Sequence, residues 1–502
     1  MAADPASGID AVTQLRAPVP VREQAPVHSG PTTGADHSRL RLTLWWVGVG
    51  VAAFTLVGLP ARATYGAQTT ADEPQYLMTA QSLGEDLDLN IVDERYSAAY
   101  RAYHAATIPV QTELQPNGGR ISPHAPLLPA ILAVPMVLGG WVAAKATLAV
   151  LAGALAALTT WVGVRRLGLR VVPTALVVGV FAVSPPLAFY ATQVYPELPA
   201  ALAVMTAFVI LTGPPGRGRA LALAGAILGL PWLAVKYVPL AFVLAAAGVW
   251  WQRSARRDLA LFGLALVGAG VAYVVFNRTV YGGWTPYAAG DFFVGGEATA
   301  IGPDADLYGR SPRLLGLLVD RGFGLAAWQP AYVLGIPALA SAMRSRRFRM
   351  RLAVALIATG WLVAVFLAQT MHGWWWPGRQ TVVVLPVVVL VIAAWVGDGS
   401  PRRMMAGLGA GIVGVASFVV LAVEATAGRL TLIVDFERTL NPLYRVWRVV
   451  LPDYRTGSVS TWLLHGLWLA LVAGAVYVAR RSPNRASPMG MKAGFGCPEA
   501  HC

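Results

Sequence analysis

The sequence predicts an all-α, polytopic membrane protein with about 12 transmembrane helices. The 502-residue chain is 56% hydrophobic and only 13% charged, whereas charged residues make up about 25% of an ordinary soluble domain. Apolar runs close to the ~20 residues that cross ~30 Å of hydrocarbon recur along the chain. Short arginine-rich links separate these runs, as in cytoplasmic loops, so the formal net charge of +14 indicates membrane topology and not nucleic-acid binding.

Both ends of the chain are expected to lie outside the membrane domain. Residues 1–38 are rich in Pro, Ala, Ser and Thr and lack apolar periodicity, which predicts a disordered cytoplasmic tail. The first apolar segment begins too late for a signal peptide. Residues 482–502 form a second cytoplasmic tail, whose Cys497, His501 and Cys502 supply too few ligands to close a tetrahedral metal site.

A single transmembrane domain is expected over residues 39–481, with both termini cytoplasmic and with outer loops at 62–124, 279–324 and 425–460. Apart from the tails, Asp258 and Asp398 are the acids expected on cytoplasmic links, so the other acids indicate that chemistry takes place outside. The expected spans are residues 42–59, 141–164, 171–185, 198–211, 221–233, 238–250, 259–276, 325–342, 352–368, 381–396, 405–423 and 461–478.

The first outer loop is expected to contain interfacial helices. Tyr96, Tyr100 and Tyr103 form an aromatic-rich section that suits amphipathic helices on a membrane surface. Residues 123–140 (PHAPLLPAILAVPMVLGG) are rich in proline and short, which predicts a re-entrant or interfacial helix before the second span.

Two adjacent carboxylates, Asp72 and Glu73, follow the first span in the stretch ADEPQYL. Pro74 disfavours helical geometry at Glu73, so a short helix is expected from Gln75 to Leu83. Charge this close to hydrocarbon is costly unless it is paired, water-lined or functional. We interpret Asp72 as a catalytic base, with ordinary loop acids or helix caps as the alternative reading of the pair.

A third acid, Glu197 in QVYPELPA, is expected at the same membrane face as Asp72 and Glu73. Two carboxylates at one cavity rim can have different roles, because one can accept a proton while the other binds hydroxyls or shifts the pKa of the first. Glu197 also directly precedes an expected helix, where a negative charge is favoured for purely structural reasons. Both readings of Glu197 remain open from sequence.

Four basic side chains on the outer side are candidates for binding a phosphate near the hydrocarbon boundary. They are Lys236 in PWLAVKYVP, Arg379 in HGWWWPGRQ, Lys145 one turn into an apolar span, and His124 beside Pro123 and Pro126. Snorkelling to headgroups, or pairing with loop acids, would account for the same cations. A structural histidine at a helix start would account for His124.

Sugar or lipid contacts are expected from aromatic and charged residues of the outer segments. The three tryptophans in a row suit stacking on a sugar or an isoprenoid, although an interfacial aromatic belt would explain them too. Asp304 and Asp306 alternate as in some calcium loops, but the other ligands of that pattern are missing, so no metal site is assigned and a divalent cation stays open. The contact candidates are Tyr76, Tyr237, Trp374, Trp375, Trp376, Asp320 and Arg321.

The stretches ADEPQYL, PHAPLLP and QVYPELPA resemble motifs of the GT-C superfamily of integral membrane glycosyltransferases. Nearest in pattern is the branch of protein O-mannosyltransferases and aminoarabinose transferases, with its actinobacterial relatives. LLGLLVDRGFGLAAWQPAYVL and GWWWPGRQTVVVLP are also similar to segments of actinobacterial members. The resemblance extends over about residues 42–478.

This resemblance implies an enzyme that transfers a sugar, with inversion, from a polyprenyl-phosphate carrier to an acceptor at the extracytoplasmic face. The family's first-loop acidic pair falls on Asp72 and Glu73, with the aspartate as base, and its second-loop acid falls on Glu197. His124 holds the place of a Lys or His found beside the prolines in several relatives. Whether His124 or a lysine elsewhere contacts the phosphate is left open.

A polyprenyl phosphate is a good leaving group that needs cations rather than a general acid, so one base and phosphate-binding cations suffice. The sugar would be mannose or arabinofuranose, and the acceptor a lipid, a polysaccharide or a protein. A transporter or lipid flippase is the chief rival, but it would need acids well inside the spans to couple ions. A non-catalytic scaffold for envelope synthesis is the second rival.

Overall fold

The computed structural model describes residues 34–291, 296–297, 306–397 and 401–481. Within these ranges the chain is built from helices, with three isolated β-bridges in the first loop and no longer strand. The C-terminal tail, with Cys497, His501 and Cys502, lies outside the described residues. So do Asp304, Asp398 and most of the N-terminal tail at residues 1–38. The all-α prediction is confirmed for the described part of the chain.

Seven described helices are long and apolar enough to cross a membrane. They are α1 (Gly34–Thr55), α4 (Leu127–Arg165), α10 (Arg256–Val280), α15 (Phe348–Leu362) with the turn after it, α16 (Leu385–Gly397) with the turn before it, α17 (Pro401–Thr426) and α19 (Val459–Arg481). Four shorter apolar segments accompany them: α5 (Val171–Ala182), α7 (Glu197–Leu211), α9 (Val238–Trp251) and α14 (Gly335–Met343), the last two with the turns before them. The chain is therefore a multi-pass membrane protein, and the count of about 12 spans stays a prediction.

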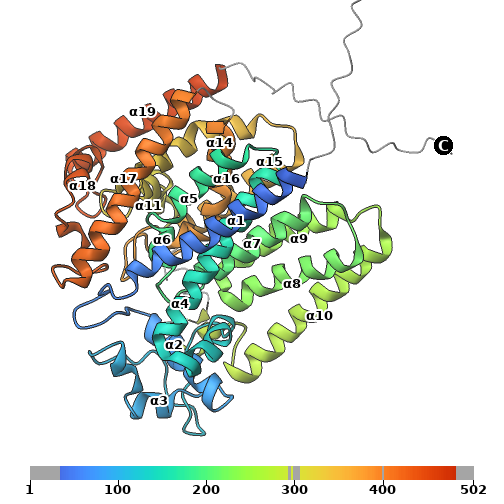
Figure 1. Cartoon of the computed structure of the whole chain (residues 1–502). Helices are drawn as coiled ribbons and strands as arrows, with labels where there is room; N and C mark the ends of the chain where they lie inside the picture. Colours follow the sequence, from blue (N-terminus) through green and yellow to red (C-terminus); the bar gives the residue numbers. More distant parts are fainter. Residues whose placement is uncertain (1–33, 292–295, 298–305, 398–400, 482–502) are drawn as a thin grey trace, which may run out of the picture.

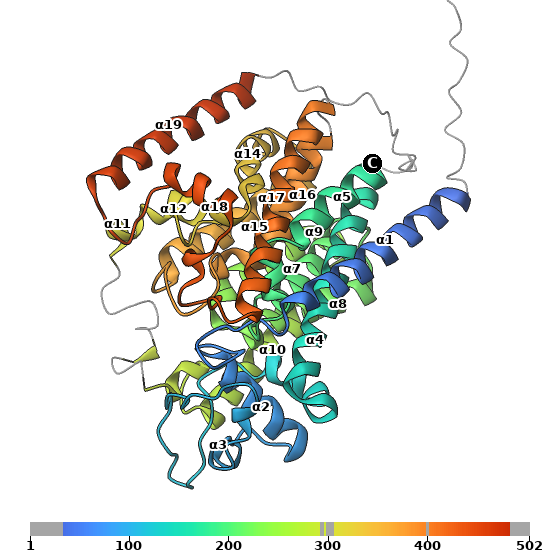
Figure 2. The same cartoon turned by 60° about the vertical axis from the view of Figure 1, so that its left-hand side comes forward.

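The long helices run side by side, and the first loop is gathered at one end of them (Figure 1). This loop holds α2 (Glu73–Glu85) and the five-residue α3 (Val92–Tyr96). α8 (Arg217–Leu233), α9 and α10 pack together on one side. In both views the start of α1 and the end of α19 lie away from α2 and α3 (Figures 1 and 2). The remaining short helices are α6 (Leu187–Tyr190), α11 (Leu307–Arg310), α12 (Arg313–Val319), α13 (Leu325–Trp328) and α18 (Pro442–Trp447).

Helix α4 joins two segments that the sequence predicts to be separate. Gly139 (φ −156°, ψ 21°) and Gly140 (φ 61°, ψ −158°) leave helical geometry in its middle, and the positive φ of Gly140 is one that glycine adopts without strain. The proline-rich segment before the break is thus distinct from the longer helix after it. Small residues then let α4 approach α1, because a Cβ on Gly153 would lie 2.2 Å from the Gly48 carbonyl oxygen.

One expected helix start is wrong, and one expected span is not a continuous helix. Helix α2 begins at Glu73, not at Gln75, because Pro74 occupies the first turn, where its missing N–H needs no partner. The span expected over 325–342 is broken into α13, a 3₁₀ turn and α14. Pro330 disfavours helical geometry at Gln329, whose φ of −137° and ψ of 86° end α13.

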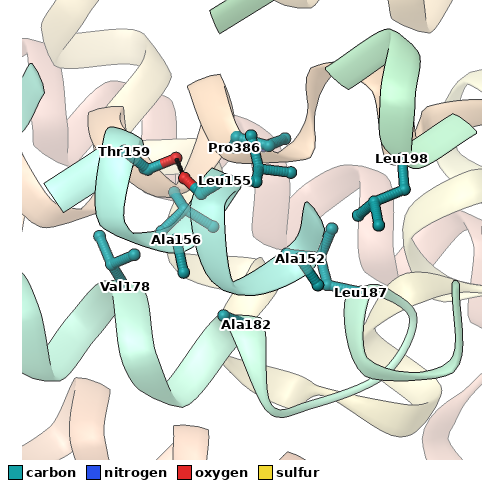
Figure 3. Close-up of a pocket in the computed structure, with 10 residues that line it drawn as sticks. Ala152, Leu155, Ala156, Thr159, Val178, Ala182, Leu187, Leu198 and Pro386 are labelled. Carbon is teal, nitrogen blue, oxygen red and sulfur yellow. Dashed lines mark hydrogen bonds between the residues drawn. The ribbon is translucent and has the colours of Figure 1, made fainter. Parts of the chain in front are cut away.

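The described core contains a small apolar cavity between α4, α5 and α16 (Figure 3). Its lining includes Ala152, Ala156, Val178 and Pro386. The Thr159 hydroxyl at its edge donates to the Leu155 carbonyl within the same helix. No charged side chain lines this cavity.

Candidate functional site

The guanidinium of Arg379 joins two acids that are far apart in sequence. Its Nε donates to Glu197 Oε1 at 2.9 Å, and its Nη1 and Nη2 each lie 3.3 Å from Asp72 Oδ2. Arg379 begins a 3₁₀ turn directly after Gly378, whose φ of 84° is left-handed. A Cβ at that glycine would also lie 2.8 Å from Leu325, so both backbone and packing require glycine beside this arginine.

Lys236 completes the group from the bend between α8 and α9. Its Nζ donates to Glu197 Oε1 at 2.6 Å and to Gln380 Oε1 at 3.0 Å. Glu197 is the first residue of α7, but Pro196 is the N-cap and no side chain caps the helix. Pairing with two cations, and not helix capping, therefore accounts for Glu197. We call Asp72, Glu197, Lys236 and Arg379 the charged cluster.

The charged cluster is formally neutral, since two carboxylates face two cations. Glu197 is 1% exposed and Arg379 8% exposed, so both charges are removed from solvent. Removing one partner of such a buried pair is strongly destabilising, because the other charge is left uncompensated. The structure thus brings together four residues that the sequence analysis singled out separately.

Asp72 is the most exposed member of the charged cluster, with 25% of its side chain exposed, followed by Lys236 with 21%. Its Oδ1 lies 3.8 Å from His124 Nε2, which is 3.0 Å from Gln111 Oε1. Burial acts to raise the pKa of the Asp72 carboxyl, but His124 and Arg379 outweigh burial and hold the pKa below its usual value. Burial lowers the pKa of His124 despite the opposing effect of Asp72. At neutral pH the site therefore presents an ionised aspartate beside a neutral imidazole.

Glu73 has a different environment from its neighbour Asp72. It is fully buried, and its two oxygens accept from the backbone N–H groups of Thr70 (3.1 Å) and Val194 (2.8 Å). Burial raises the pKa of Glu73, and Lys145 and the two N–H donors oppose this only in part. Glu73 thus fastens the start of α2 to the segment before α7, which is a positioning role.

Lys145 is the cation that most strongly opposes the rise in the pKa of Glu73. Its Nζ donates to the Gln68 carbonyl oxygen at 2.6 Å and lies 5.7 Å from the centre of the Trp141 ring. These contacts tie Lys145 to the first loop. Among the expected phosphate-binding residues, the geometry therefore groups Lys236 and Arg379 together and sets Lys145 apart.

Aromatic rings enclose the charged cluster. Tyr195 lies beneath Arg379, with its ring centre 3.9 Å from Cζ, and Tyr76 stacks on His124 at 4.8 Å. The hydroxyl of Tyr237 is buried without a hydrogen-bond partner among the described residues. Tyr287 is electrostatically coupled to Arg379 from the later outer loop.

Sequence reasoning missed four residues of this environment, namely Gln111, Tyr195, Tyr287 and Gln380. Tyr195 is two residues before Glu197, and Gln380 directly follows Arg379, so both lie inside motifs already singled out. Gln111 and Tyr287 belong to long loops and carry no local pattern that would have indicated them.

The three consecutive tryptophans do not form one stacking surface. Trp376 is fully buried against Phe189, with ring centres 4.1 Å apart. Trp375 faces Arg379 at 5.1 Å, whereas Trp374 is 63% exposed. The expected substrate contact is thus corrected for Trp376, which is a core residue.

Asp320 and Arg321 form a separate structural group. The Asp320 carboxylate accepts from the N–H groups of Gly322 (2.9 Å), Phe323 (2.6 Å) and Tyr454 (3.2 Å). Arg321 donates to the carbonyl oxygen of Leu451 at 3.3 Å. Because these contacts fix one loop to another, the expected sugar or lipid contact is corrected to a bracing role for Asp320.

No protein-family model matches the chain, and no curated protein matches it in sequence. Among solved structures it is similar to ArnT from Cupriavidus metallidurans in the apo state, with a TM-score of 0.52 and 17% identity over 89% of this chain and 73% of that one. A second structure, ArnT from the same organism bound to undecaprenyl phosphate, gives a TM-score of 0.49 and 16% identity over 87% and 78% of the two chains.

The similarity to apo ArnT defines the class of this protein by its fold. The chain is a polytopic helical membrane protein whose fold is similar to that of ArnT. At 17% identity the particular reaction has to be argued from the site of this chain itself.

Proposed function

We propose that this protein transfers a sugar, with inversion, from a polyprenyl-phosphate-linked donor to an acceptor hydroxyl at the extracytoplasmic face, in the assembly of a cell-envelope glycan or glycolipid. The observation that carries the proposal is the accessible, ionised Asp72 in one cluster with the buried Arg379 and the partly exposed Lys236. The ArnT-like fold and the motif resemblance support the same reaction class.

Asp72 would act as the general base. Its carboxylate takes the proton of the acceptor hydroxyl as that oxygen attacks the anomeric carbon, and the bond between that carbon and the phosphate oxygen breaks. The electron pair leaves with the phosphate, which changes from a diester to a monoester and gains negative charge. Arg379 and Lys236 would stabilise the developing charge. No proton donor is required for the leaving group.

The charged cluster also explains how donor binding would activate the base. Arg379 is shared between Asp72 and Glu197, and its contacts to Asp72 are the longer ones. A phosphate that engages the outer face of Arg379 would compete with Asp72 and leave Glu197 in place. Asp72 would then lose a stabilising cation and become a stronger base.

The arrangement of the chain supports an extracytoplasmic site. Asp72 directly precedes α2, and α2 and α3 lie at the end of the molecule away from the start of α1 and the end of α19 (Figures 1 and 2). The arginine-rich links expected in the cytoplasm include Arg344, Arg346 and Arg347 between α14 and α15, followed by Arg349 and Arg351 in the first turn of α15.

A donor panel tests the function. The purified protein is incubated with polyprenyl-phosphate sugars, including mannosyl and arabinofuranosyl donors, and with lipid, polysaccharide and protein acceptors. One donor should be consumed, with equal amounts of free polyprenyl phosphate and glycosylated acceptor formed. If every donor stays intact while proteoliposomes move one across the bilayer, the protein is a transporter and the proposal is wrong.

A further inference from the structure

Three carboxylates meet at the far end of α2 from the charged cluster. Asp86 follows the last residue of α2, and Asp93 and Glu94 belong to α3. One oxygen from each of the three lies within 4.8 Å of the other two. Oxygens that share a Ca²⁺ ion at 2.3–2.6 Å are at most about 5 Å apart, so the spacing fits a common cation.

Glu94 is the member of this group that most requires a partner. Its side chain is 2% exposed, and neither carboxylate oxygen has a hydrogen-bond partner among the described residues. A buried carboxylate without a donor is costly.

The protein itself supplies no cation to these acids. The ion pairs within the described residues leave out Asp86, Asp93 and Glu94. Tyr103 also faces Glu94 electrostatically, and its hydroxyl is buried and unpartnered among the described residues. Among the described side chains, those that act electrostatically on Glu94 include Asp86, Asp93 and Tyr103, which all offer oxygen.

We propose that Asp86, Asp93 and Glu94 bind a calcium ion that joins the end of α2 to α3. Oxygen ligands suit hard divalent cations, and the two exposed carboxylates leave room for water and for the irregular geometry that Ca²⁺ accepts and Mg²⁺ does not. An exposed site of this kind binds with a dissociation constant on the order of 10⁻⁴–10⁻³ M, as in extracellular modules.

This calcium site is distinct from the charged cluster. Helix α2 has 13 residues, so its two ends are about 18 Å apart at 1.5 Å per residue. The ion would brace the first loop and take no part in sugar transfer. Its test therefore does not depend on the proposed function.

The test is calcium titration of the full-length protein in detergent after removal of divalent ions, followed by calorimetry and by thermal unfolding. Wild type should bind about one Ca²⁺ per chain and unfold at a higher temperature when it is bound. Glu94→Gln and Asp86→Asn should each weaken binding at least about tenfold, the lower end of what loss of even an outer-shell partner costs a metal site. Glu113→Gln, which removes another exposed acid of the same loop, is the matched control and should bind as wild type does.

Asp86 is exposed, so loss of binding in Asp86→Asn cannot be attributed to a misfolded core. The proposal is overturned if wild type binds no Ca²⁺, which would indicate a proton shared between Asp93 and Glu94. It is also overturned if both variants bind as tightly as wild type. Equal affinity for Mg²⁺ would overturn the assignment to calcium.

Discussion

Helix α2 has acids at both ends, and the two ends are neutralised in different ways. At its start, Asp72 faces Arg379, which is 307 residues further along the chain. At its end, Asp86 lies beside the buried Glu94, and neither has an ion-pair partner within the described residues. One end is matched by the protein's own cations, whereas the three acids at the other end have no cation partner among the described residues.

This difference shows what each end can do. A protein cation held in place by Gly378 and Tyr195 is preorganised, and it can exchange one anion for another without leaving the site. An acid cluster without a protein cation instead takes its partner from solution. The first arrangement suits chemistry on an anionic substrate, and the second suits a structural ion.

The largest expected effect comes from Arg379→Ala. This change would leave Asp72, at the start of α2, without its arginine partner, so that both ends of α2 would hold acids that no arginine neutralises. Transfer should be lost, and unfolding should become easier by about 3–5 kcal/mol because Glu197 keeps a buried charge with only Lys236 beside it. Chemical denaturation in mixed micelles measures the stability. Arg438→Ala, at an arginine that is 80% exposed, is the control and should change stability by no more than ~0.5 kcal/mol. Equal stability of the two variants would contradict the pairing.

A smaller effect is expected from Lys236→Met, which keeps the aliphatic stem and removes the charge. Apparent donor affinity should fall by about tenfold or more, since a charged hydrogen bond contributes ~1.5–3 kcal/mol. Lys145→Met removes a buried lysine that contacts Gln68 and not Glu197. It should lower stability and leave donor affinity unchanged. Equal losses of donor affinity in both variants would show that the two lysines belong to one phosphate site.

At the far end of α2, stability should depend on pH in the absence of divalent ions. The pKa of Glu94 is about 8 in the folded protein and about 4.3 when unfolded. The folded state therefore binds the extra proton, so this contribution is complete below about pH 4.3 and is lost as the pH rises towards 8. Glu94→Gln should remove that decline relative to wild type in thermal unfolding. An identical pH profile in the two proteins would contradict the burial of an unpaired acid.

The sequence predicted the membrane fold because hydrophobic run length and arginine distribution are local properties of the chain. Prolines and glycines also indicated the break at Gly139 and Gly140. The break in the span at 325–342 was missed because Gln329 and Pro330 lie within a run that is otherwise largely apolar. The start of α2 was misplaced because proline is compatible with the first turn of a helix but disfavours helical geometry at the residue before it.

The candidate site was predictable where charges stand out against apolar surroundings. Asp72, Glu197, Lys236 and Arg379 could each be singled out, but their pairing depends on tertiary contacts between α2, α7 and the loop at 379. Trp376 and Asp320 looked like contact residues because aromatic and acidic side chains in loops have either role. Only their burial and their hydrogen bonds separate the two roles.

The most direct test of the central claim is single-turnover transfer by Asp72→Asn, which keeps the shape of the side chain and removes the base. Loss of a general base costs about 10²–10⁴-fold in rate, so transfer should fall by at least that range while the variant still binds the polyprenyl-phosphate donor. Glu113→Gln serves again as the matched control. Near-normal turnover by Asp72→Asn would contradict the assignment of Asp72 as the base.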